Sequence, residues 1–331
     1  MEHWPPPTKA EARLLKAEAK EADMRSLGFL VLVAAVAAGT AALRANQPRS
    51  AAARSKNSAD VPPPLAIAGL HGAASLLALS VFADSAIEHS RGRYRNPGMY
   101  APVLIAGLVV GANAKAMLGG TGGTAARDGL HVTAVALGAA GAGFHAWNVL
   151  HRPGGVSWHN LFYAAPVGAP AALALAGLIG AAADHARITR PGAPATLVGL
   201  PAGRTMSGLV AAGLAGTIAE VGLLHFRGAF NSPYMWLPVT LPPVASALLA
   251  RAAVRPAGAP LPATKLWLGL TAAVGIAGAA FHARGISRMM GGWRNWSQNV
   301  TDGPPLPAPP SFSALALAGL GALALIERDD V

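Results

Sequence analysis

Long stretches without a charged side chain constrain the fold of this chain more than any other feature of its sequence. Eight stretches contain no Asp, Glu, Lys or Arg, for example residues 61–83 and 228–250, and a ninth, residues 205–226, contains only Glu220. A helix needs ~20 apolar residues to cross the hydrocarbon core of a bilayer. We therefore predict an all-α, polytopic integral membrane protein with about nine transmembrane helices. The predicted spans are residues 27–44, 63–88, 100–118, 128–148, 161–184, 205–226, 234–254, 265–283 and 311–327.

The composition excludes several classes of cofactor and partner. The chain has no cysteine, which excludes disulfides, thiolate-held iron–sulfur clusters and covalently attached c-type haem. Its net charge of +11 comes from Lys and Arg beside the predicted spans, where they face anionic lipid. No nucleic-acid-binding signature accompanies this charge. We expect a lipid bilayer as partner, no nucleic acid, and no metal site of the protein's own.

One fifteen-residue motif occurs twice in the chain. HSRGRYRNPGMYAPV begins at His89 and HFRGAFNSPYMWLPV begins at His225, an offset of 136 residues. A second pair, GAGFHA ending at Ala146 and GAAFHA ending at Ala283, has an offset of 137 residues. The string ALALAGL also recurs, from Ala172 and then 142 residues later. Pairs with nearly the same offset indicate an internal duplication.

The duplication predicts two repeats of four helices each, residues 61–190 and 200–327. Four helices return the chain to the side of the membrane from which it started, so both repeats have the same orientation and are related by a pseudo-twofold axis along the membrane normal. A charged tail, residues 1–26, and an extra first helix with its linker, residues 27–60, precede the repeats. The 26 Lys and Arg divide equally between the two sides, so the positive-inside rule does not orient the protein.

Each copy of the motif follows an acid and places a histidine and an arginine at the end of a predicted span. These residues are Asp84, His89 and Arg91 in the first copy and Glu220, His225 and Arg227 in the second. Ionisable groups at membrane depth are costly and usually face a bundle interior or a partner. We predict that the acids and arginines face the interior and, with Arg284, form a proton, ion or quinone site. A buried ion pair between the halves, or simple capping of the helix ends, would explain the same pattern.

Six histidines are candidate haem ligands: His71, His89, His131, His145, His225 and His282. His131 and His145 lie 14 residues apart in one predicted span, on nearly the same face and about 21 Å apart. This spacing suits two b-type haems stacked across a bilayer. His71 with His131 would ligate one haem, and His145 with a histidine from the motif side would ligate the second. Hydrogen bonding between helices is the alternative role for intramembrane histidines.

The longest motif loop, residues 282–310, is a candidate docking surface for another protein subunit. It carries the paired Met289 and Met290, the aromatic Trp293 and Trp296, and a Pro-rich end. Tryptophans at this depth also serve as anchors at the membrane–water interface. The loop therefore predicts either partner binding or interfacial anchoring.

These features favour an integral membrane subunit or anchor of a bacterial electron-transfer or dehydrogenase complex in the inner (plasma) membrane, interacting with haem b or quinone. No nucleophile with an adjacent base is apparent, so we expect a non-catalytic subunit. Two alternatives remain open. One is a transporter or permease built from two parallel halves, with Asp84 and Glu220 binding a coupling ion, although prolines at the span ends argue against broken helices. The other is a membrane scaffold without chemistry.

Overall fold

The computed structural model describes residues 65–119, 124–163, 166–188, 195–197, 199–256, 258–259 and 261–329. The predicted charged tail (residues 1–26) and the predicted first helix with its linker (residues 27–60) lie outside these residues. The described part is helical, apart from β1 (Thr196–Leu197) and β2 (Leu200–Pro201), which form one short antiparallel pair. The all-α prediction is therefore confirmed.

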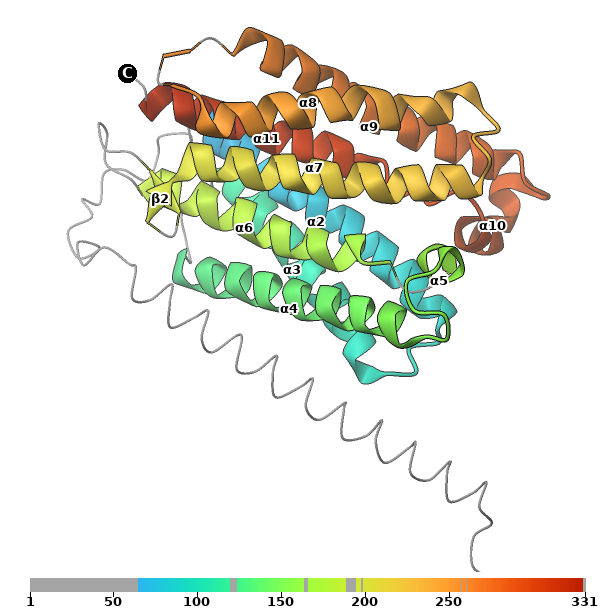
Figure 1. Cartoon of the computed structure of the whole chain (residues 1–331). Coiled ribbons are helices and arrows are strands. Elements are labelled where there is room, and N and C mark those ends of the chain that lie inside the picture. The colour runs from blue at the N-terminus through green and yellow to red at the C-terminus, as the bar shows by residue number, and fades with distance from the viewer. Residues whose placement is uncertain are drawn as a thin grey trace, which may run out of the picture.

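Eight long α-helices lie side by side and form the body of the molecule (Figure 1). They are α2 (Leu65–Arg91), α3 (Tyr100–Met117), α4 (Thr124–His151), α6 (Gly168–Ile188), α7 (Ala202–Arg227), α8 (Leu237–Val254), α9 (Pro262–Ser287) and α11 (Pro310–Asp329). Short helices cap one end of this bundle: α5 (Trp158–Tyr163), α10 (Trp296–Asp302) and the 3₁₀ turns η2 (Pro97–Met99), η3 (Pro233–Trp236) and η4 (Gly292–Asn295).

Seven of the long helices are long and apolar enough to cross a membrane. The exception is α4, whose 28 residues include Arg127, Asp128, His131 and His145. The described helices thus have the length and hydropathy of a multi-pass membrane protein in contact with a lipid bilayer. The prediction that prolines gather only at the span ends is wrong for α8. Pro242 and Pro243 lie inside this helix, which continues through them without a break.

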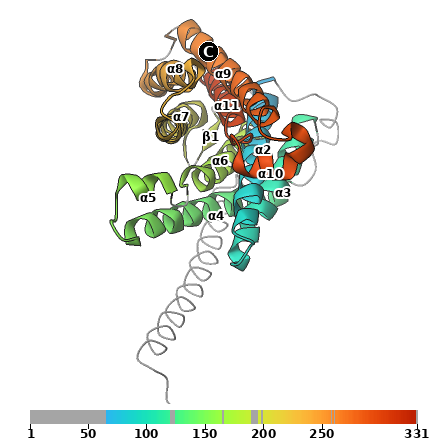
Figure 2. The same ribbon diagram turned by 90° about the vertical axis from the view of Figure 1, so that its right-hand side faces the viewer.

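The helices form two sets of four, with contacts around each set. In the first helix set, α2 contacts α3, α3 contacts α4, α4 contacts α6, and α6 contacts α2. In the second helix set, the same circuit runs through α7, α8, α9 and α11. The two sets meet through the α2–α11 and α6–α7 contacts, as the view along the bundle shows (Figure 2).

Three of the four helices that bring the two sets together, α2, α6 and α11, are the most deeply buried, whereas α7 is not. In α11, 72% of the most apolar window is buried, and in α3 only 17% is buried. Small residues allow the close packing: a Cβ added at Gly203 of α7 would lie 2.7 Å from the Ile326 nitrogen of α11. Without a hydrophobic drive between helices in lipid, such backbone approach is a main source of helix association.

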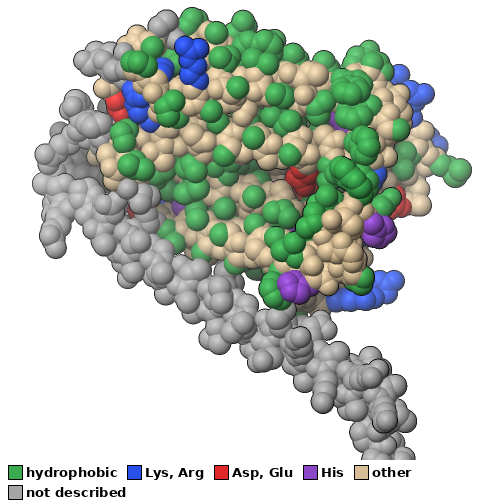
Figure 3. All heavy atoms as spheres, in the orientation of Figure 1, with side chains coloured by type: hydrophobic (Ala, Val, Ile, Leu, Met, Phe, Trp, Pro, Cys, Tyr) green, Lys and Arg blue, Asp and Glu red, His purple; other side chains and the backbone are tan. Residues whose placement is uncertain are grey.

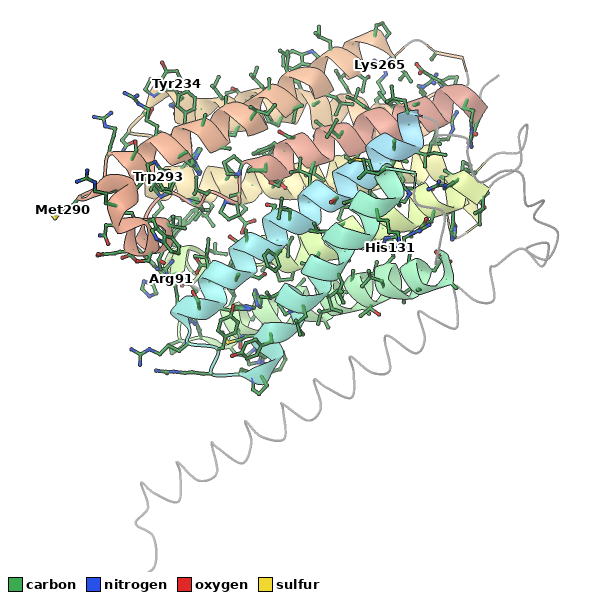
Figure 4. The ribbon with its side chains drawn as sticks, turned by 180° about the vertical axis from the view of Figure 1, so that it is seen from behind. Arg91, His131, Tyr234, Lys265, Met290 and Trp293 are labelled. Atoms are coloured by element: carbon green, nitrogen blue, oxygen red, sulfur yellow. The ribbon has the colours of Figure 1, made fainter. Side chains whose placement is uncertain are left out.

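The labelled residues of Figure 4 define two ends of the bundle. Arg91, Met290 and Trp293 lie at one end, here called the motif end (Figure 4). His131 and Lys265 lie toward the other, here called the opposite end (Figure 4). On the face seen in Figure 3, hydrophobic side chains cover the middle of the bundle and Lys and Arg gather at its ends. This distribution fits a bilayer around the middle of the bundle.

Candidate functional site

A buried polar network occupies the interior of the first helix set near the opposite end. Asn113 of α3 lies between two histidines: its Oδ1 is 2.9 Å from His71 Nδ1 of α2, and its Nδ2 is 3.1 Å from His131 Nε2 of α4. The side chains of His71 and His131 are 0% exposed. All four helices of the set contribute, because the Asp184 carboxylate of α6 lies within 4 Å of a ring nitrogen of each histidine.

Arg127 and Asp184 form the charged part of this network. Arg127 Nη2 donates to Asp184 Oδ1 at 2.7 Å, and Arg127 Nε lies 3.1 and 3.2 Å from the two carboxylate oxygens. This forked, charge-assisted geometry suits a planar guanidinium on a carboxylate. Both side chains are almost fully buried, so each needs the other to remain charged there.

The two histidines each direct one ring nitrogen toward the same carboxylate. His131 Nδ1 lies 3.5 Å from Asp184 Oδ2, and His71 Nε2 lies 3.8 Å from Asp184 Oδ1. These two nitrogens are buried and make no hydrogen bond of normal length within the described residues. They are the unsatisfied atoms of an otherwise fully bonded network, and such atoms are rare in folded proteins.

Glycine on α6 lets the network form. Gly180 packs against the His131 ring so closely that a Cβ there would overlap it, with His131 Cδ2 at 2.8 Å. Gly177, one turn earlier, lies against the His131 carbonyl oxygen, 2.6 Å from where its Cβ would be. The α4–α6 approach that brings His131 onto Asp184 thus depends on two residues without side chains.

His71 and His131 are brought together as predicted, but their arrangement does not fit a haem. Axial ligands must converge on one iron from opposite faces of a flat ring. Here the Asn113 side chain lies between the two histidines and is hydrogen-bonded to both. Asp128, His131 and Asp184 are close enough to share a metal ion, with ligand atoms within 4.8 Å of one another, but Arg127 already holds Asp184.

At the motif end, four histidines share one hydrogen-bonding pattern. His89 Nδ1 donates to the Met99 oxygen at 2.6 Å and His225 Nδ1 to the Met235 oxygen at 2.8 Å. His282 Nδ1 donates to the Pro305 oxygen at 2.8 Å, and His145 Nδ1 donates to the Pro166 oxygen. A carbonyl oxygen only accepts, so each Nδ1 carries the proton and each Nε2 of a neutral ring presents a lone pair.

These four half-buried histidines fall into two pairs, one in each helix set. His145 lies within electrostatic range of His89, and His282 within range of His225. In each pair the histidine-bearing helices, α2 and α4 or α7 and α9, are separated by helices that contact both of them. Sequence reasoning named all four residues but did not pair them.

The motif turns after α2 and α7 have the same backbone geometry. Arg93 and Tyr94 have φ values of 54° and 47°, and Ala229 and Phe230 have values of 55° and 46°. Bulky residues rarely adopt this left-handed conformation. Stacked rings accompany this conformation in both turns. The ring centres of Tyr94 and Tyr100 lie 4.3 Å apart, and those of Phe230 and Trp236 lie 4.1 Å apart. The turns therefore position the carbonyl oxygens that fix His89 and His225.

The two acids of the predicted proton, ion or quinone site lie near each other, apart from the arginines. Asp84 and Glu220 are half-buried, and Asp84 lies within electrostatic range of Glu220. Glu220 also accepts a hydrogen bond from the backbone of Gly168 at the start of α6, where a negative charge is favourable.

The prediction that the motif arginines face the interior is wrong for both residues. Arg91 is exposed and pairs with Glu88 at 3.0 Å, because at the end of α2 it extends past the packed part of the bundle. Arg227 is exposed, donates to the Phe162 oxygen at 3.0 Å and lies 5.5 Å from the Tyr163 ring centre. Arg284 is exposed as well.

The predicted docking residues lie at the motif end. Met290 is 92% exposed, Trp293 48% and Trp296 63%, whereas Met289 is half-buried. Asn299 anchors their loop from α10 by donating to the Met290 oxygen at 3.1 Å and the Gly292 oxygen at 2.8 Å. The exposed side chains are thus held by an ordered loop.

Sequence reasoning missed three members of the buried network: Asn113, Arg127 and Asp184. Arg127 and Asp184 lie at or near the ends of charge-free stretches, which invites their interpretation as boundary residues in water. Asn113 was available as a polar residue inside a predicted span.

No protein-family model matches the chain, and no curated protein or solved structure matches it. The function therefore has to be inferred from the chemistry of these side chains.

Proposed function

We propose that this protein is a membrane subunit of an electron-transfer complex that holds one b-type haem in each helix set. The ligands are His89 with His145 in the first set and His225 with His282 in the second. The observation that carries the proposal is the fixed tautomer of these four histidines, whose Nδ1–H groups all donate to backbone carbonyls. Metal-ligating histidines typically make this second hydrogen bond, which orients the ring and raises its basicity.

The two sets are, in this proposal, parallel four-helix repeats derived from a duplication. Each helix contact in one set has a counterpart in the other, and exchanging α2 with α7 and α6 with α11 converts the α2–α11 contact into the α6–α7 contact. The matching motif turns support the same relation. Duplication of a four-helix bundle with one haem site would give one haem site in each repeat.

Bound haem iron supplies a one-electron carrier. The chain's residues hold the imidazole rings at the motif end, near the exposed Met290, Trp293 and Trp296. We propose this end as the docking face for a partner subunit that exchanges electrons with the protein, in the inner (plasma) membrane of a bacterium. A quinone site at this end is less well supported, because a quinone head group does not require four rings with one fixed tautomer.

Visible spectroscopy of the detergent-purified full chain from haem-replete cells tests the proposal. We expect a reduced-minus-oxidised α-band and two haems per chain in the wild type. His145→Ala and His282→Ala should each remove about half of the haem, and the double variant all of it. The matched control is His151→Ala, since His151 is on the same helix as His145 but bonds within that helix, to the Trp147 oxygen at 3.0 Å.

The control should retain both haems. A wild type without an α-band, or a His145→Ala variant that keeps two haems, would overturn the haem proposal. The first result would favour the second candidate function, a transporter or permease built from the two repeats. That candidate is supported by the buried network of His71, His131 and Asp184, because ionisable groups inside a membrane bundle often bind coupling ions.

A further inference from the structure

The Asn113 amide fixes the tautomers of the two buried histidines. Asn113 Nδ2 lies 3.0 Å from the Val109 oxygen and 3.1 Å from His131 Nε2. Turning the amide over would place its oxygen against the Val109 carbonyl oxygen, so Nδ2 must be the donor there. His131 Nε2 therefore accepts, and Asn113 Oδ1 accepts the Nδ1–H of His71 at 2.9 Å.

This arrangement leaves one unfavourable contact, which a proton would remove. A neutral His131 carries its hydrogen on Nδ1 and directs it at Asp184 Oδ2, 3.5 Å away. A neutral His71 has no hydrogen on Nε2, so a bare lone pair faces Asp184 Oδ1 at 3.8 Å. We propose that His71 Nε2 and Asp184 form a buried proton-binding site. Adding a proton to His71 Nε2 turns this contact between two acceptors into an attractive contact between an imidazolium and a carboxylate, 3.8 Å apart.

The surrounding charges act on this uptake in both directions: Asp184 attracts a proton on His71, whereas Arg127 and Arg187 repel it. From α4, Arg127 binds Asp184, and Asp128 adds a second carboxylate beside His131 and Asp184. From α6, Arg187 donates to the carbonyl oxygens of Ala116 and Gly119 at 3.4 Å, where the negative end of the α3 dipole offsets part of its charge.

The remaining ionisable groups of neighbouring elements have partners of their own. His185 donates to the Thr196 oxygen at 3.3 Å. On α11, which packs against α2, Glu327 pairs with Lys265 and Asp329 pairs with Arg328. These partners are neither His71 nor Asp184.

The hydrogen on His131 Nδ1 and the Arg127–Asp184 pair favour a proton over a divalent metal ion at this site. A metal ligated by His131 Nδ1 would need a lone pair on the nitrogen that carries hydrogen here. It would also compete with the Arg127 fork for Asp184. His71 is the seventh residue of α2, about 9 Å along the helix from its start.

Nitrogen NMR of histidine rings in the full chain, labelled with ¹⁵N-histidine in nanodiscs, tests the proposal directly. The His71 signals are identified by their loss in His71→Gln. On acidification of the wild type, we expect His71 to change from the neutral Nδ1–H form to the doubly protonated form while the protein remains folded. Asp184→Asn should abolish this change over the same pH range, and His185→Gln, the matched control on the next residue, should leave it intact.

Three results would overturn the proposal. One is a His71 ring that keeps its neutral Nδ1–H form until the protein unfolds. Another is a neutral His71 with its hydrogen on Nε2. The third is a stoichiometric shift of the His71 or His131 signals on adding Zn²⁺, lost in Asp128→Asn, which would identify a metal site. The wild-type titration decides the matter even where Asp184→Asn does not fold. Because it needs no haem, its outcome is independent of the haem proposal.

Discussion

The two helix sets use alike residues at the motif end and unlike residues at the opposite end. At the motif end, both have a histidine pair with the same carbonyl hydrogen bonds. At the opposite end, the first set has His71, Asn113, His131 and Asp184. At the 136-, 137- and 142-residue offsets of the matching sequence strings, the second set has Ser207, Leu249, Leu268 and Ile326, each no more than 2% exposed.

This difference shows which residues four-helix packing requires and which polar residues occur only in the first set. Leu249 and Leu268 approach each other beside Gly319, much as Asn113 and His131 meet near Gly177 and Gly180. An interior in which Ser207 is the one polar residue at these four positions therefore packs in the same four-helix circuit. Replacing a buried ion pair by apolar residues is often neutral or stabilising. The polar network is thus not needed to build such a helix set, which supports a binding role for it.

The largest effect on stability should come from breaking the ion pair in the first set. Asp184→Ala leaves Arg127 buried without its carboxylate, and we expect a loss of ~3–5 kcal/mol in the free energy of unfolding. Denaturation of the detergent-solubilised protein by titration with SDS measures it. The double variant Arg127→Met/Asp184→Leu replaces the ion pair by apolar side chains and should lose much less than the single variant. Equal losses in the two variants would contradict this account of the network.

A smaller difference should appear at two matching glycines. In Gly177→Ala, the new methyl group meets the His131 backbone oxygen, which cannot move away, so we expect a loss of ~1–3 kcal/mol. In Gly319→Ala, it meets the ends of the Leu249 and Leu268 side chains at 2.9–3.1 Å, which can rotate. Thermal unfolding of both variants should show a clearly smaller loss for Gly319→Ala. The reverse order would mean that the second set is the more rigidly packed.

The smallest effects should be equal in the two sets. Tyr94→Ala and Phe230→Ala each remove one stacked ring from a motif turn. Such a pair contributes ~0.5–1.5 kcal/mol beyond its buried area. We expect similar losses of unfolding free energy in both variants, measured by SDS titration. A loss confined to one variant would show that the two turns are not equivalent.

The sequence by itself determined the helical class and most of the long helices. The charge-free stretch at residues 228–250 corresponds to α8 (Leu237–Val254), and the stretch at residues 61–83 lies largely in α2 (Leu65–Arg91). The reason is local, because a helix that crosses a bilayer needs about twenty consecutive apolar residues, and such a run can be recognised from the sequence alone. The motif at His89 and His225 also marked the two matching turns, because its aromatic residues are the ones that stack.

Only the tertiary structure decided which residues meet. Helical spacing predicted that His131 and His145 lie on one face, but not that His131 would contact Asn113 and Asp184 while His145 bonds the Pro166 oxygen. The partners come from other helices, and periodicity within one helix carries no information about the order of helices around a bundle. That order depends on which faces approach closely, at glycines such as Gly177 and Gly180, so Asp184 became a member of a buried network only once α6 was placed against α4.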